Sequence, residues 1–270
     1  MKRLLIIAAA LFVAFALGVA VVSYLRRERP PSTPLARAAQ SGDAASVQNL
    51  IAQGADVNAR DAEGYTPLAY AARSGDTDTI KRLLDAKADP NARDCNSWGW
   101  TPVINAMHKY QDDAARLLVE RGADVNARAG GCNGRKSEDG LTPLMYAAKF
   151  DESEMVKFLL EHGADPRAEY DGFNALSFAV AGGSLGRLSD IDRAAAHPCP
   201  VETVRLLLKA APDLKLSRSV VDHTVFYITE KKCPEVARLL ENRTPAPAPE
   251  KRDGDGQTNR TDAPPPVARN

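Results

Sequence analysis

The sequence contains four cysteines, whose thiols can bind metals or form disulfides: Cys95, Cys132, Cys199 and Cys233. Structural metal sites bring their ligands in close pairs, such as two cysteines two residues apart. No Cys-x-x-Cys or Cys-x-x-His pair occurs here, because the cysteines lie far apart in the chain. We therefore predict no metal site. The cysteines remain candidates for disulfide bonds or for unrelated free thiols.

The histidines give little sign of catalysis. They are scattered at His108, His162, His197 and His223. No nucleophile elbow, zinc-hydrolase motif, P-loop or dinucleotide fingerprint accompanies them. A weaker alternative places a site in residues 184–199, which contain Asp190, Asp192 and His197. We expect a short surface helix and loop there, and predict a chain that is not an enzyme and binds no cofactor.

The composition narrows the choice of partner. Lysine plus arginine and aspartate plus glutamate are balanced at 35 each, and aromatic residues make up 6% of the chain. A nucleic-acid-binding domain carries a clear basic excess. The balance predicts a chain that does not bind nucleic acid.

Two short motifs recur in register along the middle of the chain. The first is Gly-Ala-Asp-Val-Asn-Ala-Arg or a close variant, found at residues 54–60, 87–93, 122–128 and 163–169. The second is Thr-Pro, found at Thr33-Pro34, Thr66-Pro67, Thr101-Pro102 and Thr142-Pro143, with Asn174-Ala175 where a fifth belongs. The basic period is 33 residues, and longer spacings contain insertions. A fixed period of this length indicates a stack of small repeated units.

With these motifs the chain resembles the ankyrin-repeat family over about residues 33–243. The resemblance implies an all-α solenoid of about six helix-turn-helix units joined by finger loops, with atypical first and last units acting as caps. The physical pattern agrees. Threonine caps a helix well and proline suits its first position, while the second helix of each unit repeats an apolar face, as in Ile80, Leu83 and Leu84. Stacked units bury that face as one core.

The glycine that opens the first motif marks the end of each second helix. Gly54, Gly122 and Gly163 stand where a left-handed backbone is favoured. Lys87 takes the equivalent place in the second unit. We therefore expect backbone strain at Lys87.

Insertions interrupt the repeat around residues 95–97, 129–137 and 184–199, and Cys95, Cys132 and Cys199 lie in or beside them. Cys95 and Cys132 fall in the enlarged fingers of consecutive units. Cys199 and Cys233 each precede the proline that opens a second helix. Their equivalent places predict two disulfides, Cys95–Cys132 and Cys199–Cys233. Such bonds persist in an oxidising compartment.

The two ends of the chain differ from the repeats. Residues 4–25 form a nearly unbroken apolar run flanked by basic residues, and about 20 apolar residues suffice to span a bilayer as a helix. We expect a transmembrane or signal-anchor segment at 1–29, a linker at 30–32, the repeats at 33–243 and a disordered proline-rich tail at 244–270. The predicted location is a bacterial inner membrane with the repeats in the periplasm; a cleaved signal and a soluble periplasmic protein is the alternative.

The resemblance also implies a binding surface, because ankyrin proteins usually bind through finger tips and the exposed side of the first helix. The implied partner-binding residues are Glu63, Tyr65, Arg73, Trp98, Trp100, His108, Lys109, Tyr110, Lys149, Phe150 and Phe173. For the two tryptophans the alternative is packing within an enlarged finger.

The predicted function is that of a monomeric, membrane-tethered scaffold that binds a partner protein through this concave face. The alternative is an immunity or inhibitor protein that neutralises a toxic enzyme in the same compartment.

Overall fold

The computed structural model describes residues 31–95, 99–130, 140–181, 199–216 and 233–241. All regular elements within these ranges are α-helices. The one strand-like pairing among them is an isolated bridge between Tyr170 and Phe173. The all-helical architecture expected from the repeats is confirmed.

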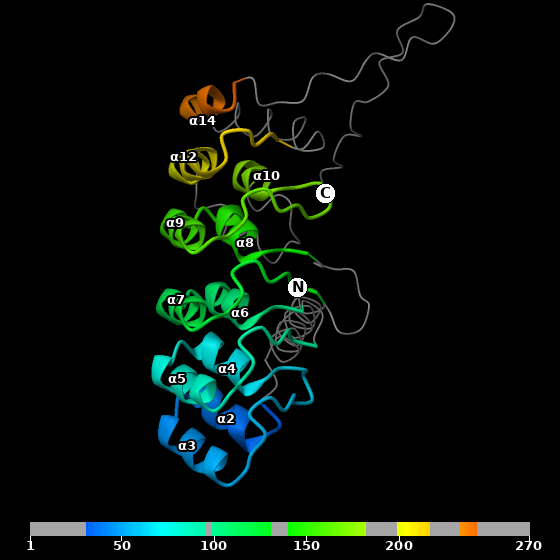
Figure 1. Ribbon diagram of the computed structural model, residues 1–270, viewed down its shortest axis with the longest axis vertical. Coiled ribbons are helices and arrows are strands. Elements are labelled where there is room, and N and C mark those ends of the chain that lie inside the picture. The colour runs from blue at the N-terminus through cyan, green and yellow to red at the C-terminus, as the bar shows by residue number, and fades with distance from the viewer. Residues whose placement is uncertain (1–30, 96–98, 131–139, 182–198, 217–232, 242–270) are drawn as a thin grey trace, which may run out of the picture.

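The helices form two parallel layers (Figure 1). The inner helices are α2 (Pro34–Ser41), α4 (Pro67–Ser74), α6 (Pro102–His108), α8 (Pro143–Lys149) and α10 (Ala175–Ala181). The outer helices are α3 (Ala44–Ala52), α5 (Thr77–Asp85), α7 (Asp112–Glu120), α9 (Ser153–Glu161), α12 (Val201–Ala210) and α14 (Pro234–Leu239). Finger loops project from the inner layer, on the side away from the outer helices (Figure 1).

A threonine fixes the start of four inner helices. The Oγ1 atom of Thr66 accepts a hydrogen bond from the backbone N–H of Ala69 at 3.2 Å. Thr33, Thr101 and Thr142 make the same bond, and a proline follows each. In α10 the side chain of Asn174 substitutes, accepting from the N–H of Ser177 at 3.0 Å. A side-chain oxygen at the same position thus sets the register of each inner helix.

The interior is close-packed and apolar. Small side chains such as Ala71, Ala72 and Ala147 are fully buried, which lets neighbouring inner helices approach closely. The outer helices contribute their predicted apolar faces, and Ile80 and Leu83 are fully buried. These side chains belong to a core that runs from the first described unit to the last.

Hydrogen bonds between the turns that follow the outer helices join successive units. The side-chain oxygen of Asn58 accepts from the backbone N–H of Asp89, and Asn91 accepts from Asp124, each at 2.8 Å. Asn126 continues the series to the N–H of Asp165, also at 2.8 Å. We call this series the asparagine ladder. It ties each unit to the next without using the core.

Eight turns that follow helices adopt a left-handed backbone. The glycines that follow three outer helices have φ of 86° at Gly54, 95° at Gly122 and 88° at Gly163. Lys87 occupies the equivalent place with φ of 70°, so the strain expected there is confirmed. A second left-handed place follows the inner helices, at Gly42, Gly75, Tyr110 and Asp151.

Several predicted features lie outside the described residues. These include the apolar run 4–25, the first residue of the 30–32 linker, the tail 244–270, and most of each insertion. Within the described ranges, no helix combines the length and the apolarity required to cross a bilayer.

Candidate binding surface

The C-terminal ends of three consecutive inner helices bring candidate side chains together. We define the inner row as Arg73, His108, Lys109, Tyr110, Lys149 and Phe150. Arg73, His108 and Lys149 each stand seven residues after the capping threonine, and each lies in the last helical turn. Because the caps hold the helices in register, these side chains occupy equivalent places on neighbouring units.

An aromatic cluster lies under the middle of the inner row. The ring of Trp100 stacks at an angle against His108, with centroids 4.5 Å apart, and meets Tyr146 edge-on at 6.1 Å. Tyr146 also packs on Phe150 at 4.9 Å. The Tyr146 hydroxyl lies 3.0 Å from Nδ1 of His108 and hydrogen-bonds to it. The cluster therefore fixes the ring of His108 between units three and four.

Two cations of the row lie over aromatic rings. The guanidinium of Arg73 is 5.2 Å from the centroid of Tyr65, and its Nη1 donates to Oδ1 of Asn105 at 3.2 Å. The Nζ of Lys149 is 5.2 Å from the centroid of Phe150. Such cation–π contacts hold a long side chain in place at a modest energetic gain. The row is thus pre-ordered.

A polar contact ties two fingers to their inner helices. The hydroxyl of Tyr70 donates to the buried carboxylate of Asp61 at 2.7 Å. Burial raises the pKa of the Tyr70 phenol, and this hydrogen bond raises it further. In the next unit Nδ2 of Asn105 donates to Asp94 at 2.9 Å. These pairs set the angle between finger and helix beside Arg73.

A family model described as ankyrin repeats in three copies matches residues 35–129 and 130–188. The match covers more than half of the 270 residues. The chain belongs to the ankyrin-repeat family. Ankyrin repeats are generally protein–protein interaction modules, so the inner row lies on a domain built for binding.

A curated relative of this ankyrin chain is the 2-5A-dependent ribonuclease of Mus musculus. The two are 34% identical over 113 residues, which is 42% of this chain and 10% of the mouse protein. The ankyrin chain thus aligns with about a tenth of that relative. The likeness concerns the relative's ankyrin region and carries no enzymatic activity to this chain.

The partner-binding residues that the ankyrin resemblance implied differ in how deeply they are buried. Tyr110 is 65% exposed, and partly exposed residues of the set are Glu63, Tyr65, Arg73, His108, Lys109 and Phe173. Three others are corrected to buried positions: Trp100 at 7%, Lys149 at 6% and Phe150 at 3% exposure. The aromatic cluster covers Trp100, which takes the packing role of its two alternatives. Trp98 lies outside the described residues.

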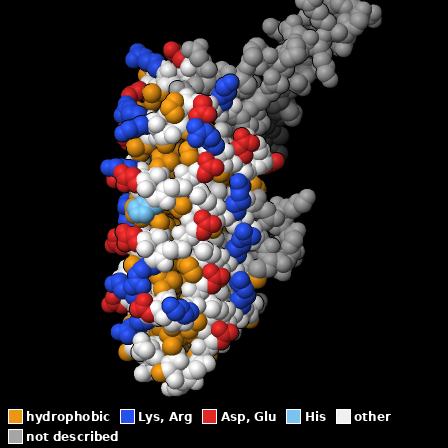
Figure 2. Space-filling view, in the orientation of Figure 1, with side chains coloured by type: hydrophobic (Ala, Val, Ile, Leu, Met, Phe, Trp, Pro, Cys, Tyr) orange, Lys and Arg blue, Asp and Glu red, His pale blue; other side chains and the backbone are white. Residues whose placement is uncertain are grey.

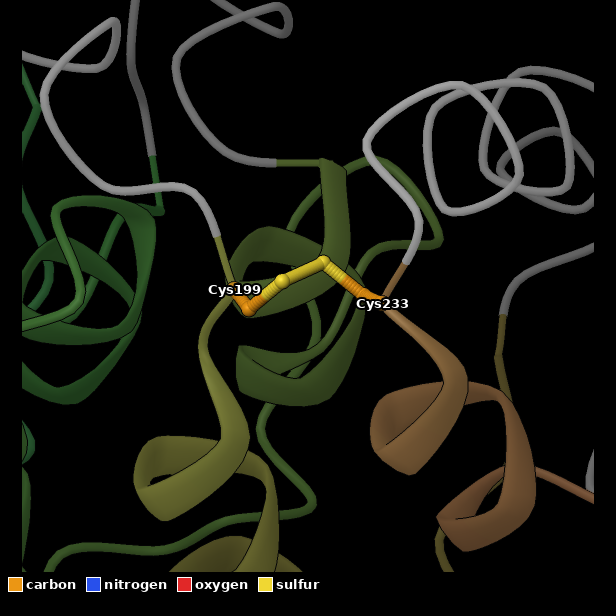
Figure 3. The surroundings of a disulfide bond; sticks show 2 residues. All are labelled: Cys199 and Cys233. Carbon is orange, nitrogen blue, oxygen red and sulfur yellow. A yellow bond between two sulfur atoms is a disulfide. The ribbon is translucent and has the colours of Figure 1, made fainter.

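The predicted disulfide in the C-terminal ankyrin units is confirmed (Figure 3). Cys199 and Cys233 are bonded, with Cα atoms 5.7 Å apart, and they precede α12 and α14. Cys95 is disulfide-bonded as well. Cys132, its predicted partner, lies outside the described residues.

Tyr70, Asn105 and Tyr146 each stand four residues after a threonine cap, and the sequence patterns above did not predict a role for them. The finger sequences did contain residues that indicate their partners. Where Asp61 and Asp94 stand in two fingers, the next finger has Ala129, whose backbone N–H bonds Leu141 in the same pattern. With no carboxylate offered there, the Tyr146 hydroxyl pairs with His108 instead.

The described residues offer little else for chemistry. They contain no group of three or more metal-binding side chains. His162 caps α9, and its Nδ1 lies 2.8 Å from the carbonyl oxygen of Phe158. That geometry gives His162 a structural role at the end of the helix. His197 and His223 lie outside the described ranges of this ankyrin chain.

Proposed function

We propose that this ankyrin domain binds a partner protein through the inner row and the adjoining fingers, and that it is a binding module rather than an enzyme. The observation that carries the proposal is the run of accessible Arg73, His108, Lys109 and Tyr110 on consecutive units. Tyrosine and arginine are typical binding hot spots. Tyrosine offers a large contact area with few rotatable bonds, and the planar fork of arginine is pre-organised for hydrogen bonding. The contacts beneath the row reduce the entropy lost on binding.

Quantitative co-purification tests this proposal. The full chain in detergent is compared with the triple variant Arg73→Ser, Lys109→Ser, Tyr110→Gly, which removes side chains without touching the buried cluster. We expect a protein that co-purifies with the native chain to be lost. The matched control carries equivalent changes on outer helices: Lys81→Ser, Lys157→Ser and Lys209→Ser.

The control decides between surface and fold. If the inner-row variant and the outer-helix variant retain the same set of proteins, the proposed surface is wrong. If the unfolding midpoint of each variant equals that of the native chain, the fold is intact in both.

We further propose that the domain is tethered to a bacterial inner membrane and faces the periplasm. The apolar run 4–25 and the disulfide Cys199–Cys233 support this location, because disulfides are rare in reducing compartments. Protease digestion of spheroplasts tests the orientation. We expect the repeats to be cleaved from outside, and protection of the repeats until the membrane is lysed contradicts the proposal.

A further inference from the structure

The inner helices are unusual in the sign of their charge. All five lie fully within the described residues, and none contains an aspartate or a glutamate. The charged side chains they do contain are Arg37, Arg73 and Lys149. His108 ends α6, and Lys109 follows it directly. The inner helices therefore contribute only basic charged side chains to the binding face proposed above, of which Arg37 and Arg73 are accessible while Lys149 is buried.

The helix dipole does not explain this sorting. A dipole favours cations at every helix C-terminus, yet three outer helices end in a carboxylate: α5 in Asp85, α7 in Glu120 and α9 in Glu161. Acidic and basic side chains also alternate along the edge of the molecule that the outer helices form (Figure 2). The excess of basic groups is a property of the inner face.

Tyr110 adds an apolar element to this face at a cost to the fold. Its φ is 60°, in the left-handed region where the first two units place Gly42 and Gly75. Asp151 occupies the same place in the fourth unit, and aspartate enters the left-handed region more readily than tyrosine. Its Oδ1 accepts a hydrogen bond from Thr203 of the neighbouring unit at 2.6 Å. Tyr110 instead keeps 65% of its surface exposed, the largest exposure of any big hydrophobic side chain described. A strained and exposed aromatic residue points to binding.

We propose that the partner presents an acidic segment to the inner row, with Tyr110 as the apolar contact at its edge. Carboxylates of the segment pair with Arg73 and Lys109, and an apolar side chain between them packs on the Tyr110 ring. The basic face also attracts the segment at a distance, so association is fast and weakens with salt. This inference deepens the function proposed above and rests on it.

Selection from a phage library of random peptides tests the partner's chemistry without assuming its identity. The target is the full chain in detergent micelles. We expect enriched peptides to carry a net negative charge and to lose affinity as salt is raised. The Arg73→Gln, Lys109→Gln double variant is expected to bind the same peptides about tenfold more weakly.

Two matched controls separate binding from folding. The outer-helix pair Lys81→Gln, Lys157→Gln removes the same number of charges and is expected to leave affinity unchanged. Tyr110→Gly relieves backbone strain, so it is expected to raise thermal stability while weakening the peptides about tenfold. Lys87→Gly relieves the same strain elsewhere and is expected to raise stability alone.

The outcomes distinguish the two proposals. Enriched peptides that are neutral or basic, yet still depend on Tyr110, overturn the acidic partner and leave the binding surface in place. Peptides that bind the inner-row variants as tightly as the native chain, or a library that yields no binder dependent on the row, overturn both.

Discussion

The first four repeats and the last two are held together by different means. From α2 to α9, the units are joined by the asparagine ladder and start on repeated threonine caps. Beyond α9 the ladder position is taken by Arg167, whose guanidinium pairs with the side chain of Asp213. The outer helices there, α12 and α14, are joined by the Cys199–Cys233 bond.

The comparison shows what joins neighbouring units where the repeat sequence departs from the common pattern. A ladder bond depends on asparagine at one place and on a regular turn one period later, so it is encoded locally. The last units have lost those residues, and a covalent link substitutes. Stability of a solenoid is close to a sum of unit and interface contributions, so the two regions are expected to respond to different changes.

Breaking the disulfide is expected to have the largest effect. The Cys199→Ser, Cys233→Ser double variant lacks the cross-link between two residues that are 34 positions apart in the sequence. We expect it to lose about 3 kcal/mol of stability. Native-state hydrogen exchange shows which helices lose stability. We expect faster exchange in α12 and α14, with α4 and α5 unchanged, whereas uniform loss along the chain contradicts the division into two regions.

Breaking the ladder is expected to have a smaller effect in the opposite region. Asn91→Ala removes the acceptor of the Asp124 backbone N–H, which costs about 1 kcal/mol. Urea unfolding followed by circular dichroism measures the change. The control is Asn49→Ala on outer helix α3, an exposed asparagine away from the ladder; an equal loss in both variants removes the ladder from the account.

Restoring the usual glycine is expected to strengthen the first region. Lys87→Gly removes the left-handed strain at φ of 70°. At the equivalent Gly54, an added Cβ meets no atom within 4 Å, so the cost at Lys87 is conformational rather than steric. We expect a gain of about 0.5–1 kcal/mol by thermal unfolding. A loss of stability shows that the lysine side chain contributes contacts that outweigh the strain.

Removing the ion pair is expected to have the smallest effect. Arg167 and Asp213 are both more than half exposed, and solvent screens such pairs strongly. The hydrogen bond to Asp213 and its charge raise the pKa of the Arg167 guanidinium, which therefore stays protonated across the working range. We expect Arg167→Ala to change the unfolding midpoint less than Asn91→Ala, and a larger change refutes the claim that the disulfide holds this region.

The sequence allowed the backbone of the fold to be predicted, but much less of the surface. The spacing of the threonines and glycines predicted the inner helices, the turns and the strain at Lys87, because each depends on residues within one unit. The Cys199–Cys233 pair was predictable because both cysteines occupy the same place in neighbouring units. Side-chain burial was not, because it depends on contacts between units. Trp100 is covered by His108, from the inner helix of its own unit, and by Tyr146, from the next unit.

Site-specific photo-crosslinking tests the central claim most directly. A benzophenone amino acid replaces Tyr110 on the inner row in one variant and Lys157, exposed on outer helix α9, in a matched control. Cells that express the full chain are irradiated, and crosslinked products are resolved by mass spectrometry. The account predicts a protein partner joined at position 110, through an acidic segment, with none at 157. Equal crosslinking from both positions, or crosslinking from 157 alone, contradicts it.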